Sequence, residues 1–331
     1  MKALFTFLSN LLVLSVISQS FDYYPTSNGE LIKHTYYALS YLEEHEQPEW
    51  VAYHLKPEML HKVYKRKNTF RPDPKVSKGS ATYADYKSAP NYDAGHLLPS
   101  RQMQFDCTAM SETFFMSNMS PQESSFNRHK WSHLERLERN MAFRNGGLYV
   151  ITGPVLKNTL GHIGVSNKIS IPSHYYKIFL YDNEASSKAI AFLLPNKKES
   201  KEFIDYVVPI DSIESLTGID FFPILEDELE NKLESVTQVE LWSFSNPYSN
   251  FNYTLPDRSC NSTAVTPNQT PKLIEVNSAS SSLLESLPGI GPVKAQAIIN
   301  SRPFSSKKDL LRVKGIGPAT LNKIEHLISV K

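Results

Sequence analysis

The stretch NYDAGHLLPS, residues 91–100, places an aspartate, a glycine and a histidine within four positions. A surface turn that happens to hold a histidine would explain these residues equally simply. A functional interpretation of Asp93 and His96 depends on a later segment, SNMSPQESSFNRHKWSHLERLER at residues 117–139.

The second stretch predicts a helix that begins near Asn127. A four-residue step then aligns an amide, an indole, a carboxylate and a guanidinium along one side of the helix. These side chains belong to Asn127, Trp131, Glu135 and Arg139. Leucines on the adjacent face can pack against a core. A solvated helix with ordinary surface charges is the alternative for this segment taken alone.

Together, the two stretches supply what phosphodiester hydrolysis requires: a base for water, a hard cation on the phosphate, and positive charge for the transition state. His96 can act as the base. Asn127 can bind Mg²⁺ through oxygen, since this ion needs few protein ligands. Glu135 can hold the metal-bound waters, and the guanidinium of Arg139 can neutralise phosphate charge.

Residues 48–245 resemble the DNA/RNA non-specific endonucleases of the ββα-metal fold. Their signature, Asp-Arg-Gly-His, then Ser-Asn-x-x-Pro-Gln, Asn, Trp and Leu-Glu, corresponds in order to DAGHLLPS, SNMSPQ, FN, W and HLE. The resemblance implies an α+β fold with a central antiparallel sheet. It also implies that His96 is the general base, Asn127 the direct ligand of Mg²⁺ or Mn²⁺, Glu135 the holder of metal-bound water, and Arg139 a phosphate contact.

Other matched positions receive less specific roles from the resemblance. Asn118 is expected to support the metal or the base, and Asp93 to orient the loop or the metal waters, or simply to form a turn. Arg66 is the candidate for a family arginine upstream of FRPDP. Ala94 replaces the usual arginine after the aspartate, which removes a cation near the phosphate. Arg128, further along, could contact the substrate backbone.

The C-terminal residues contain an internal repeat. LPGIGPVKAQAI at 287–298 recurs as VKGIGPATLNKI at 313–324. A proline after the second glycine suits the first turn of a helix, whose N-terminus favours phosphate. Residues 272–331 hold nine Lys or Arg against four Asp or Glu, a net charge of +5, within a chain whose net charge is +1.

This tail resembles the tandem helix-hairpin-helix modules of competence DNA receptors. The resemblance implies sequence-independent DNA binding by an all-α domain. The contacts it implies are the backbone amides of four glycines, with two lysines nearby: Gly289, Gly291, Gly315, Gly317, Lys294 and Lys314. Packing of the hairpins against each other or against a protein partner is the alternative.

The predicted organisation has four parts. Residues 1–20 are a signal peptide with Lys2 before an apolar run, 21–256 the endonuclease domain, 257–272 a polar linker, and 273–331 the helix-hairpin-helix domain. The expected location is secreted or periplasmic, with no membrane span after cleavage. Cys107 and Cys260 could pair in an exported protein, although two cysteines form no disulfide framework.

Within residues 21–256, β-rich runs alternate with irregular loops, without the regular spacing of a doubly wound sheet. Strands are expected at 50–55, 148–154, 175–182 and 189–195, and helices at 36–44, 132–143, 212–216 and 226–233.

The sequence thus predicts a secreted Mg²⁺-dependent endonuclease of DNA and/or RNA, joined to a tail that binds the DNA backbone. A catalytically weak or inactive DNA-binding or uptake protein is the main alternative, and Ala94 favours it slightly. A phosphodiesterase of small nucleotides is another. The oligomeric state is left open.

Overall fold

The structure, a computed structural model, describes residues 23–183, 186–245, 254–260, 273–325 (except 280, 282–283, 285–286 and 288–289) and 327–330. The predicted signal peptide, residues 261–272 of the predicted linker, and Gly289 lie outside the described residues. Within the described part of the chain, no helix has the length and hydropathy needed to cross a membrane.

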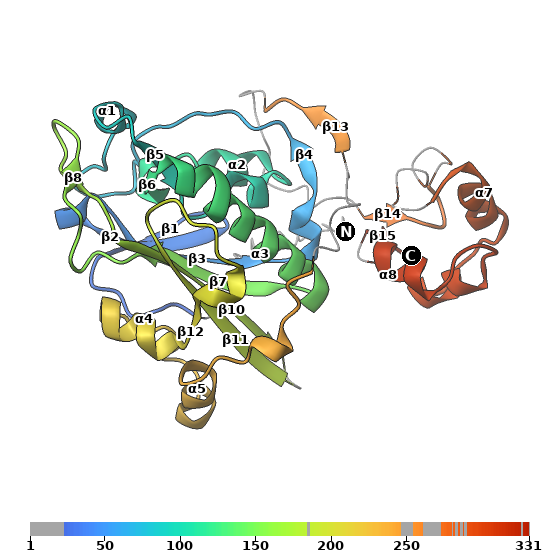
Figure 1. Cartoon of the computed structure of the whole chain (residues 1–331). Coiled ribbons are helices and arrows are strands. Elements are labelled where there is room, and N and C mark those ends of the chain that lie inside the picture. Colours follow the sequence, from blue (N-terminus) through green and yellow to red (C-terminus); the bar gives the residue numbers. More distant parts are fainter. Residues whose placement is uncertain are drawn as a thin grey trace, which may run out of the picture.

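The main body is built on one seven-stranded sheet whose neighbouring strands are all antiparallel (Figure 1). The spatial order of the strands is β1 (Glu30–Lys33), β2 (Tyr37–Leu42), β3 (Gln47–Leu55), β7 (Leu148–Pro154), β10 (His174–Asn183), β11 (Ser186–Pro195) and β12 (Val207–Val208). The predicted central antiparallel sheet is confirmed.

Both faces of this sheet are buried under helices. Successive side chains of a strand point to opposite faces. Val51 and Tyr53 accordingly join the hydrophobic cluster beneath α3 (Ser132–Asn145), whereas Trp50 joins the cluster beneath α4 (Ile210–Thr217) and α5 (Asp227–Glu234). The body therefore has three layers, with α3 on one face and the α4–α5 pair on the other (Figure 1).

A second, two-stranded antiparallel unit carries the DAGH stretch. β5 (Tyr92–His96) pairs with β6 (Met119–Glu123), and a π-helical segment, Phe126–Trp131, leads from β6 into α3. A Cβ on Gly95 would lie 2.1 Å from Oε1 of Gln122, so this position of β5 requires glycine. Two strands followed by a helix are the ββα element that the sequence predicted.

The expected helix at residues 36–44 is wrong. Residues 37–42 form β2, and only residues 43–45 form a short 3₁₀ turn. β2 lies between β1 and β3, and its first five residues are all buried. A short apolar run buried on both faces has no polar alternation, so its periodicity cannot distinguish a strand from a helix.

Smaller elements complete the body. The helices are α1 (Tyr83–Lys87) and α2 (Cys107–Glu112), with 3₁₀ turns at 57–60, 100–103, 116–118, 203–206 and 239–241. The strands are β4 (Lys62–Tyr64), β8 (His162–Ile163), β9 (Ile169–Ser170) and β13 (Thr254–Arg258).

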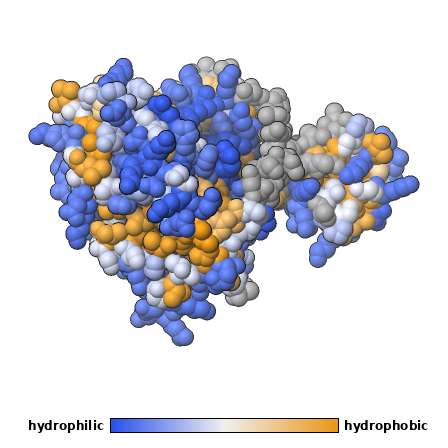
Figure 2. Space-filling model, in the orientation of Figure 1, coloured by the Kyte–Doolittle hydropathy of each residue, from blue (hydrophilic) through white to orange (hydrophobic). Residues whose placement is uncertain are grey.

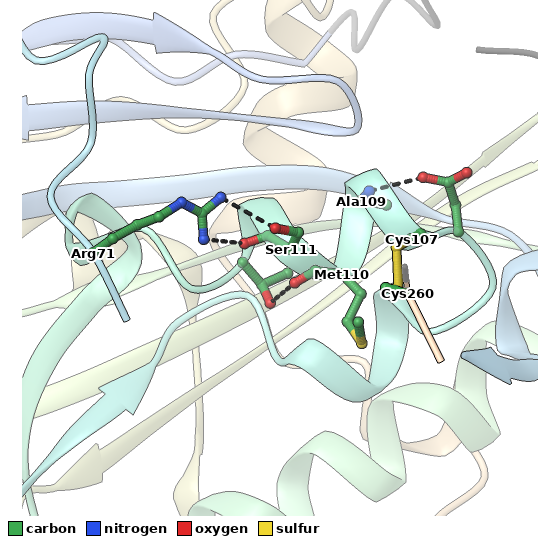
Figure 3. The surroundings of a disulfide bond; sticks show 8 residues. Arg71, Cys107, Ala109, Met110, Ser111 and Cys260 are labelled. Carbon is green, nitrogen blue, oxygen red and sulfur yellow. Dashed lines mark hydrogen bonds between the residues drawn. A yellow bond between two sulfur atoms is a disulfide. The ribbon is translucent and has the colours of Figure 1, made fainter. Parts of the chain in front are cut away.

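A disulfide joins Cys107, at the start of α2, to Cys260 (Figure 3). At the other end of α2, the guanidinium of Arg71 donates to the carbonyl and hydroxyl oxygens of Ser111. Just before Cys260, the backbone of β13 pairs in parallel with β4. Residues 257–260, the first four of the predicted linker, are therefore attached to the body.

The tail has a hydrophobic cluster of its own. It contains α7 (Pro292–Asn300), a 3₁₀ segment (Lys307–Arg312) and α8 (Pro318–Ile324), together with a two-residue parallel pairing of β14 (Ile274–Glu275) and β15 (Ile328–Ser329) that an all-α prediction lacks. Gly291 and Gly317 cap α7 and α8 with nearly the same backbone angles, φ −96° and ψ −179° against φ −97° and ψ 177°. The sequence repeat is thus a structural repeat.

Candidate active site

One cavity of about 530 Å³ opens between the ββα element and the loops before it. His96, Asn127 and Glu135 all line it, so the structure brings together the predicted base and both predicted metal-site residues. Four cationic side chains border the same cavity: Arg66, Lys87, Arg101 and Arg128. The surface around β5, β6 and the start of α3 is predominantly hydrophilic (Figure 2). A cavity of this character suits a polyanion.

His96 lies at the end of β5 and is only 8% exposed. Its ring meets the ring of Phe114 edge-on at 4.9 Å, and the indole of Trp131 donates to its backbone carbonyl. Nε2 is buried without a hydrogen-bond partner among the described residues. Burial, assisted by the positive charge of Arg66, lowers the pKa of His96 to about 3. The imidazole is therefore neutral at physiological pH and can accept a proton.

The amide of Asn127 has a fixed orientation. Its Nδ2 donates to the carboxylate of Asp93 at 2.9 Å. Arg128 grips the same carboxylate through two hydrogen bonds, from Nε at 2.9 Å and from an Nη at 2.7 Å. These donors and Ser124 hold the pKa of Asp93 below its usual value, although burial alone would raise it. Because Asp93 occupies the amide nitrogen, Oδ1 of Asn127 is the atom left for a cation.

Glu135 stands on the first turn of α3 and is partly buried. Removal from water raises the pKa of its carboxyl to about 7, against the opposing effects of Lys177 and Arg139. A divalent cation beside such a group favours the charged carboxylate. The amide oxygen of Asn127 and this carboxylate are the hard donors that Mg²⁺ prefers, so the residues fit the expected ion.

Two predicted site residues lie away from the cavity surface. Arg139 donates to Oε1 of Gln102 at 3.2 Å and is not among the lining residues. Asn118 is fully buried. Its Oδ1 accepts from the backbone N–H of Leu98, and its Nδ2 donates to the carbonyls of Leu98 and Thr113. Asn118 thus fixes the loop that follows His96, and neither side chain is placed to touch a phosphate in the cavity.

Arg66 lines the cavity, with its guanidinium 5.3 Å from the centre of the Phe114 ring and Nε bonded to Asn68. From this position, the positive charge of Arg66 contributes to the lowered pKa of His96. Ala94 also lines the cavity, where the family arginine would stand. Arg128 reaches the same wall from the π-helical segment, so a cation is still present next to Asp93.

Sequence reasoning missed a buried polar network beneath the site. The ammonium of Lys177, in β10, contacts Oε2 of Glu138 at 2.9 Å, and neither side chain is exposed to solvent. Tyr53 and Gln102 donate to the other carboxylate oxygen of Glu138. Gln102 also bonds Arg139. The network ties α3 to the sheet. Only the position of Lys177 inside an apolar strand could have signalled it.

In the tail, the predicted contact residues gather on the two glycine turns. Gly291, Gly315 and Gly317 are exposed, and Gly315 has φ +90°, which favours glycine. The aliphatic part of Lys294 lies 3.6 Å from where a Cβ of Gly315 would stand, so this side chain lies beside the second glycine turn. Lys314 is exposed.

Known nucleases resemble the main body. "Nuclease EXOG, mitochondrial" of Danio rerio is 28% identical over 66% of this chain and 68% of its own length. "Mitochondrial nuclease" of Saccharomyces cerevisiae is 31% identical over 62% of this chain and 70% of its length. A crystal structure of the EndoG/EndoGI complex superposes with a TM-score of 0.56 at 28% identity, covering 60% of this chain and 87% of that one.

These relatives contradict the prediction of a secreted or periplasmic protein, because those from Danio rerio and Saccharomyces cerevisiae are named as mitochondrial nucleases. The prediction failed because the composition of residues 1–20 is ambiguous. They hold four serines and no acidic residue. Mitochondrial transit peptides are also rich in serine and poor in acidic residues, so a short apolar run does not by itself identify an export signal.

Two sequence families match this chain in succession. The helix-hairpin-helix motif matches residues 270–329, in agreement with the tail. The DNA/RNA non-specific endonuclease family matches residues 21–228, which include the whole ββα element and α4. The chain is therefore a member of the DNA/RNA non-specific endonuclease family that carries a helix-hairpin-helix motif at its C-terminal end.

Proposed function

We propose that this chain is a metal-dependent endonuclease that hydrolyses phosphodiester bonds of DNA and/or RNA without sequence specificity, in the cavity beside β5. The observation that carries the proposal is the Nε2 atom of His96. It is buried, has no hydrogen-bond partner among the described residues, and belongs to a ring that lines the same cavity as Asn127 and Glu135. A buried polar atom without a partner is costly, and a catalytic role is one reason for which such an atom is retained.

In the proposed mechanism, His96 accepts a proton from the attacking water through Nε2. The ring packs against Phe114, and the indole of Trp131 fixes the backbone carbonyl of His96, so the base is already oriented when the substrate enters. A bound phosphodiester brings negative charge near the ring, which favours the imidazolium that proton transfer creates.

Asn127, through Oδ1, and Glu135 would hold a magnesium ion, with manganese as an alternative. When bound, such an ion polarises a phosphate oxygen and stabilises the charge that develops on the leaving group. Asp93 acts indirectly, because it fixes the Asn127 amide and Arg128. Arg66 and Arg128 are the proposed phosphate contacts, while the placement of Arg139 on Gln102 supports a positioning role instead.

The direct test is cleavage of supercoiled plasmid and of a structureless RNA by the full chain, with added Mg²⁺ and with EDTA. We expect nicked and then linear plasmid only when the metal is present, with no preferred cutting position. Binding of plasmid without cutting, in both conditions, would contradict the proposal and favour the inactive DNA-binding protein instead. The RNA arm decides the substrate preference.

Arg128 should replace the missing family arginine at position 94. The Arg128→Ala variant is expected to bind DNA of every sequence more weakly. The negative slope of log affinity against log salt should become less steep by about one, as loss of one phosphate contact does. Binding is measured by fluorescence anisotropy across salt concentrations. Arg136→Ala, an exposed arginine of α3 that does not line the cavity, is the matched control. An unchanged salt slope for Arg128→Ala would exclude the contact.

The tail should act as a second DNA-binding site. Truncation after Cys260 retains the disulfide and β13, and is expected to leave cleavage of a short oligonucleotide within about twofold. It should lower the efficiency on plasmid by about tenfold or more, because the effective concentration of phosphates near the cavity falls. The double variant Lys294→Ala, Lys314→Ala should show part of this loss, whereas Gln296→Ala should not. Equal losses on both substrates would indicate a structural role for the tail.

A further inference from the structure

A cluster of three carboxylates lies far from the cavity. Asp211 and Glu214 stand on α4, and Glu234 is the last residue of α5. One carboxylate oxygen of each lies within 4.8 Å of the others. The three oxygens are therefore close enough together to hold one metal ion. Ca²⁺, which takes oxygen ligands at about 2.3–2.6 Å, suits a site made of carboxylates.

Glu234 is the informative member of the cluster. Its side chain is buried, with 5% exposed, and its Oε1 has no hydrogen-bond partner among the described residues. The burial follows from its neighbour, since Leu233 packs into the hydrophobic cluster beneath α4 and α5. A buried carboxylate oxygen without a hydrogen bond or counter-charge is unfavourable.

Among the described residues, the surroundings of the cluster supply no ion-pair partner: no lysine, arginine or histidine forms an ion pair with any of the three. Burial, reinforced by four neighbouring carboxylates, raises the pKa of Glu234 to about 8; the neighbours are Glu214, Glu230, Asp211 and Asp220. The electrostatic environment therefore favours either a proton or a cation.

The cluster can be reached by an ion from solvent. Asp211 is exposed and Glu214 partly buried, so the three residues form a graded path from the surface to Glu234. Oε1 of Glu214 accepts a hydrogen bond from the backbone N–H of Phe221 at 3.0 Å, which fixes that carboxylate in place. Three carboxylates leave positions for waters, as Ca²⁺ requires with its six to eight oxygen ligands.

We propose that Asp211, Glu214 and Glu234 form a structural calcium site that joins the start of α4 to the end of α5. It lies on the opposite face of the sheet from the cavity, since α4 and α5 pack on the Trp50 side and α3 on the Val51 side (Figure 1). Ca²⁺ bound there stabilises the folded body and takes no part in cleavage, so the site is separate from the proposed metal position at Asn127.

The test is the melting temperature of the full chain, freed of metals by chelation, as CaCl₂ is added. The wild-type protein is expected to melt about 3 °C or more higher at saturating Ca²⁺, by preferential binding to the folded state. Glu234→Gln, and separately Glu214→Gln, should abolish this rise. Glu228→Gln, which removes an exposed charge from the same helix, should retain it.

Asn127→Ala separates this site from the cavity. If the calcium-induced rise persists in Asn127→Ala and vanishes in Glu234→Gln, the α4–α5 site is supported, whatever the outcome of the cleavage assay. If the rise vanishes in Asn127→Ala and persists in Glu234→Gln, the ion binds in the cavity and the proposal is wrong. No rise in the wild-type protein, with no heat of Ca²⁺ binding by calorimetry, would also overturn it.

Discussion

His96→Ala is expected to lower the rate of plasmid nicking by about 10²- to 10⁴-fold, the range that a general base contributes. The loss should appear in kcat, with DNA affinity nearly unchanged, because the neutral imidazole has no charge with which to hold phosphate. Nicking rates and binding are measured on the same preparations. The buried neutral ring should also be replaced at little electrostatic cost, since burial already holds the pKa of His96 far below its usual range.

Two control measurements accompany this prediction. His162→Ala changes an exposed histidine of β8 and should cut like the wild-type protein. Melting curves of His96→Ala show whether the body still folds, since the ring packs on Phe114. A well-folded His96→Ala protein that nicks at the wild-type rate would remove His96 from the mechanism and leave Glu135 as the alternative base.

The sequence predicted the convergence of His96, Asn127 and Glu135 because the motif and the helical spacing act over short distances. His96 ends β5 and Asn127 lies in the π-helical segment that follows β6, so one ββα element brings both to the cavity. Their catalytic roles remain predictions. Arg139 differs because a four-residue step identifies one side of a helix without indicating where the cavity ends. It lies one turn beyond Glu135, about 6 Å farther along the axis.

The strands expected at 50–55, 148–154, 175–182 and 189–195 form β3, β7, β10 and β11. Residues that favour strands, bounded by turn residues, identify them even though both faces of the sheet are buried. β2 was interpreted as a helix because all but its last residue are buried. Residues 254–260 gain their position from the pairing of β13 with β4, where Thr254 is the partner of Lys62. They also gain it from the disulfide of Cys260, which spans 153 residues. Local composition around residue 257 is polar and carries no trace of either contact.

The Glu138–Lys177 pair is another long-range contact that local sequence does not reveal. Its disruption is expected to have a large effect on stability. Nothing in the repeat LERLER distinguishes Glu135, which borders the cavity, from Glu138, which is fully buried. Lys177→Met should destabilise the protein by about 3–5 kcal/mol, since removing one partner leaves an uncompensated buried charge. Chemical denaturation measures the loss, and Lys168→Met, at an exposed lysine, is the control.

The double variant Glu138→Leu, Lys177→Met separates charge from packing. Replacing both partners by apolar groups of similar volume removes the unpaired charge, so it should recover most of the lost stability. Tyr53 and Gln102 then lose an acceptor, which limits the recovery. If the double variant is as unstable as Lys177→Met alone, the lost hydrogen bonds to Tyr53 and Gln102 outweigh the ion pair. The network would then stabilise α3, and the cavity above it, through its neutral hydrogen bonds.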